Sequence, residues 1–207
     1  MAFVKCILQY IIVCNIKICY SYAMDRKTQL LEAATKVFFK YGASKARFGD
    51  IAKEAGVSRP TLYAAFEDKD AILVATIHHV AQQFVTMINN QIADKVTMEE
   101  RLALFTRITV VEPYQLIQKS KDAADILTGH NEAGRQAIRE TLELKSILLM
   151  EILAPFFKNA NEEDVILEQC RTFVHSSSGL KNTVADDVEL QKRIAVLSAV
   201  FLDKFSN

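Results

Sequence analysis

From Asp25 onward, the apolar residues of this 207-residue chain recur at spacings of three and four, a periodicity that is typical of helices. A helix with one apolar stripe must bury that stripe, so a chain of this kind packs helix against helix. The six Gly, three Pro and absence of Trp disfavour a turn-rich sandwich or barrel. No segment shows convincing strand alternation, and we therefore expect an all-α protein.

The first 23 residues differ in character from the rest. Lys5 precedes an apolar stretch, and residues 21–23 (Ser-Tyr-Ala) resemble a small-residue cleavage site, which together outline a signal peptide. Polar residues interrupt that stretch, however, and Met24 stands directly before a charged amphipathic pattern. Two interpretations stay open for residues 1–23: a mis-called extension upstream of a start at Met24, which we prefer, or a signal-like segment. Elsewhere nothing approaches the roughly 20 apolar residues of a membrane span.

The distribution of cysteines and charges constrains the cellular compartment and the kind of partner. Three of the four Cys lie in the first nineteen residues, so Cys170 alone cannot build a disulfide framework or metal knuckle, and a reducing cytoplasm fits. The net charge is zero and by itself indicates no partner. Residues 24–69 nevertheless carry nine Lys and Arg against six Asp and Glu, while residues 70–207 carry fourteen against nineteen. This basic head points to an anionic partner, although chance produces imbalances of the same size.

Capping and breaking residues divide the chain into helices. Gly42 and Gly56 predict helix ends, Ser58 predicts an N-cap with Pro60 in the first turn, and Asp68 predicts the start of a long helix. The expected helices span about 25–41, 48–55, 59–66, 69–93, 98–111 (with a break near Pro113), 114–119, 122–127, 132–157, 162–177 and 188–205.

The segment 48–66 has the properties of a helix-turn-helix. Ala52 is small enough for two helices to cross closely, and Gly56 permits a positive φ in the turn. Val57, Leu62 and Phe66 can fill the core between the helices. The second helix could then enter a DNA major groove while the first crosses the backbone.

The sequence of residues 51–73, IAKEAGVSRPTLYAAFEDKDAIL, closely resembles the DNA-binding signature of TetR-type bacterial transcriptional repressors. Residues 33–42 resemble that family's first helix. The resemblance covers about residues 25–85, and beyond them only length and helical character match. It implies a three-helix helix-turn-helix DNA-binding domain at 24–69 and a helical effector-binding and dimerisation domain at 70–207. We accordingly expect a cytoplasmic, homodimeric regulator that binds operator DNA, most simply a repressor released by a small apolar effector.

The resemblance also implies which side chains meet DNA. Arg59 is the candidate for base readout, because its planar fork can bind guanine O6 and N7 together, with phosphate contact as the alternative. Tyr63 and Lys69 match the family's phosphate-contacting positions. Ala46 stands where the family usually has Thr, and Arg47 could compensate for the lost hydroxyl. The full set of expected DNA contacts is Lys45, Arg47, Ser58, Arg59, Pro60, Thr61, Tyr63 and Lys69.

Two further sets of residues are expected in the body. An apolar or amphipathic effector is expected to wedge against the long helix that begins at Lys69, although the same side chains could simply fill a core. The expected pocket residues are Phe84, Val85, Ile88, Leu102, Phe105, Ile126, Leu148 and Leu149. The last two helices are expected to form a four-helix bundle across a two-fold axis. The expected interface residues are Cys170, Phe173, Val174, Ile194, Leu197 and Phe201.

The chain offers little for catalysis. Its sequence contains no nucleophile–base–acid arrangement, phosphate loop or dinucleotide fingerprint, and we expect neither enzymatic activity nor a cofactor. His78 and His79 are adjacent, so on a helix they project about 100° apart and form no metal site. The competing hypothesis is an all-helical enzyme or protein-interaction module with a helix-turn-helix-like N-terminus. Sequence-selective, salt-sensitive DNA binding distinguishes the two.

Overall fold

A computed structural model of the chain describes residues 21–119, 131–157 and 163–205. These residues form helices and contain no strand, which confirms the expected all-α fold. In chain order the elements are α2 (Ser21–Lys45), α3 (Phe48–Glu54), α4 (Arg59–Ala65), α5 (Lys69–Asn89), η1 (Ile92–Asp94), α6 (Met98–Thr106), η2 (Arg107–Val111), α7 (Glu112–Gln118), α9 (Glu132–Leu153), η3 (Ala154–Phe156), α10 (Glu163–Leu180) and α11 (Asp187–Asp203).

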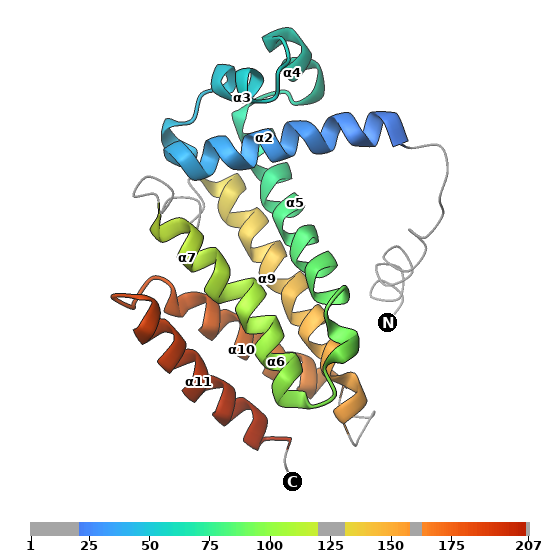
Figure 1. Cartoon of the computed structure of the whole chain (residues 1–207), viewed down its shortest axis with the longest axis vertical. Coiled ribbons are helices and arrows are strands. Elements are labelled where there is room, and N and C mark those ends of the chain that lie inside the picture. Colours follow the sequence, from blue (N-terminus) through green and yellow to red (C-terminus); the bar gives the residue numbers. More distant parts are fainter. Residues whose placement is uncertain (1–20, 120–130, 158–162, 206–207) are drawn as a thin grey trace.

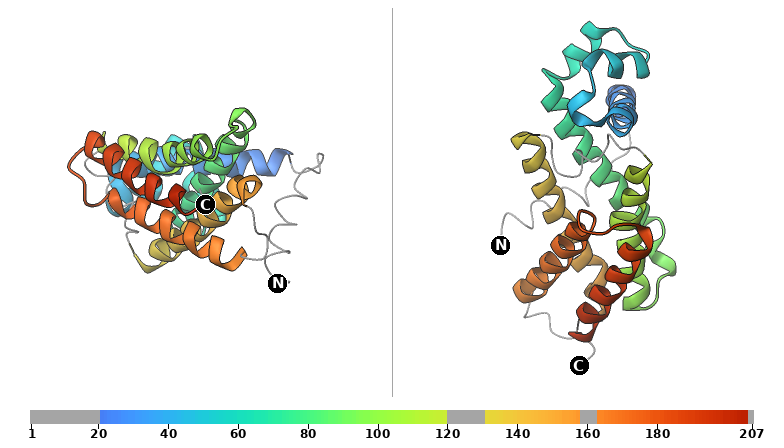
Figure 2. Two further views of the ribbon diagram at one scale, coloured as in Figure 1. Left: turned by 90° about the horizontal axis from the view of Figure 1, so that it is seen from below. Right: turned by 90° about the vertical axis from the view of Figure 1, so that its left-hand side faces the viewer.

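The molecule is elongated, with the N-terminal helices at one end (Figure 1). Helix α2 lies across α5, with α3 and α4 beyond it, and α5 continues from this end into the body beside α9. Helices α10 and α11 pack together at the opposite end from α3 and α4 (Figure 2). Helix α5 therefore belongs to both ends of the molecule.

The capping and breaking residues of the N-terminal helices act where the sequence predicts, although α2 begins at Ser21 and continues past Gly42 to Lys45. Gly42 interrupts α2 with φ 75°, and Gly56 follows α3 with φ 66°, conformations that glycine adopts without steric cost. The Asp68 carboxylate accepts a hydrogen bond from the Ala71 amide at 2.7 Å and caps α5. These helices enclose a core of their own, made of Leu30, Leu31, Ala34, Val37, Phe38, Ala43, Ala46, Ile51, Ala52, Leu62, Phe66, Ile72 and Leu73.

Helix α5 is the only described helix long and apolar enough to cross a membrane by length and composition. It is also a central helix of this fold, packed against α2 and α9, and core helices of soluble proteins share that composition. It ends at Asn89, earlier than expected, and η1 follows.

The break expected near Pro113 is wrong. Helix α6 continues through the π-helical turn η2 into α7, with Pro113 in the first turn of α7. Proline has no N–H for the carbonyl four residues earlier, and the wider turn accommodates that loss without ending the helix.

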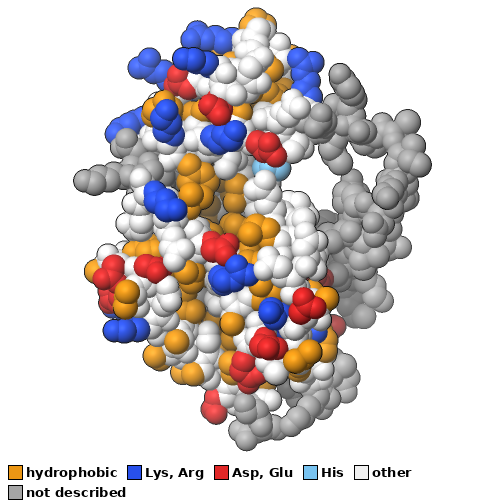
Figure 3. Space-filling view, viewed as in Figure 1, with side chains coloured by type: hydrophobic (Ala, Val, Ile, Leu, Met, Phe, Trp, Pro, Cys, Tyr) orange, Lys and Arg blue, Asp and Glu red, His pale blue; other side chains and the backbone are white. Residues whose placement is uncertain are grey.

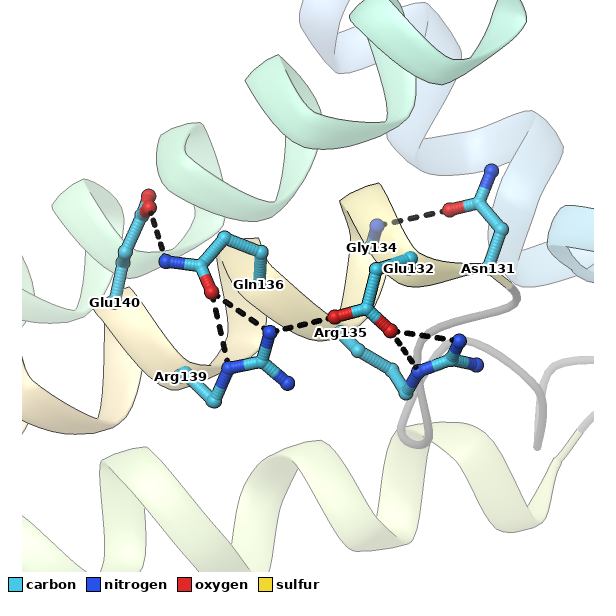
Figure 4. Close-up of polar contacts among 7 residues, drawn as sticks. All are labelled: Asn131, Glu132, Gly134, Arg135, Gln136, Arg139 and Glu140. Carbon is cyan, nitrogen blue, oxygen red and sulfur yellow. Dashed lines mark hydrogen bonds and ion pairs between the residues drawn. The ribbon is translucent and has the colours of Figure 1, made fainter.

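Asn131 caps the start of helix α9, and its side-chain oxygen accepts a hydrogen bond from the Gly134 amide at 2.9 Å. Its exposed side carries a polar network in which Glu132 binds both Arg135 and Arg139 (Figure 4). Further along, Glu140 lies 3.0 Å from His78 Nε2 and connects α9 to α5. The helix expected at 122–127 lies outside the described residues.

Candidate functional site

Helix α4 presents one face to the core and the other to solvent. Leu62 and Phe66 are buried in the N-terminal core with residues of α3 and α5. Arg59, Pro60 and Tyr63 are exposed. A short helix anchored by two apolar side chains has its outer face available for a ligand. This is the arrangement that a recognition helix requires.

Ser58 and Thr61 serve the helix itself. The Ser58 Oγ accepts a hydrogen bond from the Thr61 amide at 3.2 Å and lies 2.8 Å from Thr61 Oγ1. The expected N-cap at Ser58 is therefore confirmed. A hydroxyl can donate and accept at once, so this capping role leaves DNA contact by Ser58 and Thr61 as a prediction.

The Arg59 guanidinium lies over Gly49 of α3. A Cβ atom added to Gly49 would stand 2.5 Å from Arg59 Nη2, closer than such atoms approach. The absent side chain of Gly49 thus makes the space that Arg59 occupies. The sequence alone did not connect these residues, because the contact depends on how α3 and α4 cross.

Tyr63 is 56% exposed, and its ring lies against Phe48 with the ring centroids 4.5 Å apart. The Phe48 contact fixes the ring and leaves most of the side chain at the surface. This placement fits the expected phosphate contact.

Three basic residues surround this helix pair. Lys45 and Arg47 are exposed between α2 and α3, and Figure 3 shows Lys and Arg side chains gathered over this end of the molecule. Ala46 between them is buried in the N-terminal core, so its side chain points inward. Lys69 has protein partners: its ammonium donates to the backbone oxygens of Ser44 at 3.1 Å and Ala46 at 3.4 Å. Phosphate contact by Lys69 stays a prediction.

A cavity of about 520 Å³ opens below this end of the molecule. Figure 3 shows hydrophobic side chains in a hollow beneath the basic end. Its walls come from both halves of the fold: Thr35, Phe38 and Phe39 of α2; Leu73, Thr76, Ile77, Val80, Ala81, Gln83, Phe84 and Met87 of α5; Ile108, Thr109, Glu112, Pro113, Leu116 and Ile117 of η2 and α7; Ile138, Thr141, Leu142 and Lys145 of α9; and His175, Ser178, Gly179, Lys181 and Asn182 at the end of α10.

Of the expected pocket residues that the structure describes, one lines this cavity. Phe84 lines the cavity, and Ile126 lies outside the described residues. The others are buried in the core of the body, because the faces of α5, α6 and α9 that carry them pack against one another; these are Val85, Ile88, Leu102, Phe105, Leu148 and Leu149.

Two lysines that the sequence interpretation missed lie in this cavity. Lys145 of α9 is only 8% exposed, its Nζ 3.5 Å from the Thr109 backbone oxygen and 5.0 Å from the centroid of the Phe84 ring. Burial, followed by the charge of Lys181, lowers the pKa of Lys145 well below its usual range. Burial lowers the pKa of Lys181 to about 8. The helical period could have indicated that Lys145 is buried, because Lys145 lies on the same face of α9 as Thr141 and Leu149, which are both buried.

Most of the side chains expected at the dimer interface point into the core of their own chain. Within the single chain, Cys170, Phe173, Val174 and Phe201 are buried in the body core, where burial raises the pKa of the Cys170 thiol to about 12. Ile194 is buried in a neighbouring cluster and Leu197 packs partly against the body core. Helices α10 and α11 use these side chains to join the body, so an interface would need their outer faces.

The described part of the chain shows no group of three or more His, Cys, Asp or Glu that could hold a metal ion. His78 contacts Glu140 and His79 contacts Gln83, so the adjacent pair diverges as expected.

Comparison with known proteins connects the N-terminal end to one family. Residues 30–76 match the family described as bacterial regulatory proteins, tetR family. The fatty acid metabolism regulator protein of Bacillus subtilis is 34% identical over 76 residues, 37% of this chain and 39% of that protein. The regulator HbdR of Aromatoleum is 37% identical over 78 residues, 38% of this chain and 34% of its own length. The chain thus spans between about a third and two fifths of the length of these curated relatives.

Solved structures match over most of the fold. FadR from Bacillus subtilis, in complex with stearoyl-CoA, gives a TM-score of 0.55 at 24% identity and covers 87% of this chain and 98% of its own. A TetR transcription regulator from Haloarcula marismortui gives 0.63 at 18% identity, with the same coverage of both chains. These likenesses establish the fold, an N-terminal helix-turn-helix followed by a helical body.

Proposed function

We propose that this chain, whose residues 30–76 match the tetR family of bacterial regulatory proteins, is a sequence-specific transcriptional repressor released from its operator by a small molecule. The observation that carries the proposal is the shared cavity. Its walls include α2 and α5, which hold the DNA-binding end, as well as α9 and α10 of the body. A ligand there touches both halves of the molecule.

DNA recognition is assigned to the exposed face of α4. Arg59 reads a base edge in the major groove, while Pro60 and Thr61 lie against the groove wall. Tyr63, with Lys45 and Arg47 on the approach to α3, binds phosphate. Contacts of this kind set the orientation on DNA and make the affinity depend on salt.

Release is assigned to α5. Its first residue, Lys69, is bound to the end of α2, and its later residues Val80 and Phe84 line the cavity. A ligand that widens the space between α5 and α9 tilts α5 and carries the helix-turn-helix with it. Such a ligand releases DNA only if it prefers the tilted state, since a ligand shifts an equilibrium by its differential affinity.

The active species is assigned as a homodimer in the cytoplasm, joined through the outer faces of α10 and α11. These faces expose Val165, Val196 and Val200 to solvent. A two-fold dimer places two recognition helices about 34–36 Å apart and binds a palindromic operator. The domain boundaries proposed are 24–69 for DNA binding and 70–207 for the body.

Selection of genomic fragments by the purified protein tests the DNA-binding proposal. The selected DNA should share a palindrome, and anisotropy titration should give an affinity at least a thousandfold above that for scrambled DNA, decreasing steeply with salt. Equal affinity for both sequences contradicts a sequence-specific regulator. Val80→Trp tests whether the cavity is coupled to DNA binding, because a larger side chain in the cavity wall should lower operator affinity. Val96→Trp, at an exposed position, is the control.

A further inference from the structure

The wall of the cavity is mainly apolar but carries two lysines in one region. Lys145 enters from α9, and Lys181 lies in the turn that follows α10. The Lys145 ammonium has three donors, of which one faces the Thr109 backbone oxygen at 3.5 Å, the long limit of a hydrogen bond. The Phe84 ring lies 5.0 Å from the same nitrogen. These contacts orient Lys145 but supply no counter-charge.

Neither lysine forms an ion pair with a carboxylate of the described residues. Glu112 also lines the cavity, but its carboxylate binds Arg107. Two lysine amino groups thus line one mainly apolar cavity, and no carboxylate of the described residues pairs with either.

Two ammonium groups in this enclosure carry an electrostatic cost unless an anion lies between them. A buried ammonium without a counter-charge loses its hydration, and a second ammonium nearby adds repulsion. The lowered pKa values of both lysines express the same cost. An anion between them would remove the repulsion and restore the charged forms, whereas a neutral ligand would leave the cost in place.

Resting on the effector cavity proposed above, we infer that its ligand is an amphipathic anion with a single carboxylate. The carboxylate is held by the ammonium groups of Lys145 and Lys181. An aliphatic chain lies along the apolar wall toward α2, against Val80, Ile77 and Phe38. The volume of about 520 Å³ falls within the usual range for small-molecule sites.

The head group is tested with two twelve-carbon probes that share a chain and differ in charge. Calorimetric titration of the full chain with dodecanoate and with dodecanol, below their aggregation limits, should show roughly ten- to hundredfold tighter binding of dodecanoate. Lys145→Met and Lys181→Met should each reduce this preference by about tenfold or more. Lys192→Met, an exposed lysine of α11, should keep it. Methionine suits the apolar surroundings, and thermal unfolding verifies that each variant is folded.

Three results overturn the inference: equal affinity of the two probes, an unchanged preference in both cavity variants, or binding of dodecanoyl-CoA with no binding of free dodecanoate. Absence of binding by every probe overturns it together with the proposed effector cavity. Operator affinity is measured separately, so a chain that prefers dodecanoate but fails to bind selected DNA retains the ligand assignment and loses the proposed repressor function.

Discussion

The Lys69 ammonium donates to the backbone oxygen of Ser44 at 3.1 Å and so attaches the first residue of α5 to the end of α2. Ala46 provides a second acceptor at 3.4 Å. Carbonyl groups at a helix C-terminus attract a cation, which stabilises this junction. The junction matters because α5 is the helix that passes from the DNA-binding end to the cavity.

Replacing Lys69 with Met should therefore weaken folding as well as DNA binding. We expect a loss of about 1 kcal/mol in the free energy of unfolding, since the carbonyls lose a charged donor. Urea denaturation measures this loss, and Lys192→Met on the exposed side of α11 serves as the control. An unchanged unfolding free energy would show that Lys69 does not stabilise the junction.

The close approach of Arg59 to Gly49 gives a test of base readout that leaves Arg59 in place. Gly49→Ala should displace the guanidinium, because the new Cβ would stand 2.5 Å from its Nη2. The end of a long side chain moves easily, so we expect stability to change by less than about 1 kcal/mol. Preference for one operator base pair should decrease, by roughly 1–3 kcal/mol for Arg59→Ala and by part of that for Gly49→Ala.

The double variant Gly49→Ala, Arg59→Ala separates the two explanations. Adding Gly49→Ala should have almost no further effect on specificity once Arg59 is absent. Additive losses measured by anisotropy on a base-substitution panel would mean that Gly49 acts independently of Arg59. An equal loss on every sequence for Arg59→Ala would move Arg59 to the phosphate contacts.

Gly56 and Gly179 form a matched pair for backbone conformation. Both have open space around the position of an added Cβ, but Gly56 has φ +66° whereas Gly179 lies in α10. Gly56→Ala should lower the free energy of unfolding by about 1 kcal/mol, and Gly179→Ala should raise it by a few tenths to about 1 kcal/mol. Thermal denaturation checks both. The same sign for the two substitutions would contradict a conformational role for Gly56 in the turn.

Much of the N-terminal fold could be predicted because its signals are local. Ser58, Asp68 and Gly56 act on the backbone within a few residues, so their effects can be read from the sequence. Pro113 misled the prediction because its cost depends on whether the helix can widen, and the π-helical turn before it does so.

The cavity and the interface could not be predicted in the same way. Periodicity shows which residues of a helix are apolar but not which neighbour they pack against. Leu149 and Phe173 are equally apolar candidates for a pocket or an interface, and in the structure both fill the body core. Lys145 escaped notice because a lysine within a helix usually points to solvent, and only the packing of α5 and η2 against α9 encloses it.

The ion pair between Arg171 and Glu143 joins α10 to α9 and should make stability depend on pH. Hydrogen bonding by the Arg171 guanidinium, with Arg171 Nε 2.9 Å from Glu143 Oε2, holds the pKa of that carboxyl below its ordinary value. A lowered folded-state pKa contributes stability above the unfolded pKa of about 4.5, and the contribution is lost as pH falls through the folded value. Arg171→Met should thus cost up to about 1 kcal/mol at pH 7, since both side chains are partly exposed, and less at pH 3, which lies below the unfolded pKa.

Glu143→Gln provides the control for this pair. In that background Arg171→Met should cost little at either pH, because the carboxylate that it pairs with is absent. Urea denaturation of the four proteins at both pH values gives the coupling directly. A coupling that is the same at pH 7 and pH 3 would contradict an ionic origin.

The outer face of α11 provides the last prediction. Val196 and Val200 lie one helical turn apart and are 66% and 61% exposed, so in the single chain they bury little. Exposed apolar side chains at this spacing are typical of a surface that a partner covers. The double substitution Val196→Glu, Val200→Glu should therefore give folded monomers, measured by sedimentation equilibrium, that bind a palindromic operator at least tenfold more weakly. Val96→Glu, at a 75% exposed position before α6, should leave the dimer intact.

Phe201→Glu should instead unfold the body, because Phe201 lies in its core with its ring centroid 4.8 Å from that of Phe173. A double variant that remains dimeric would place the interface on another surface, whereas a folded monomeric Phe201→Glu would return the interface to the face that we assign to the core.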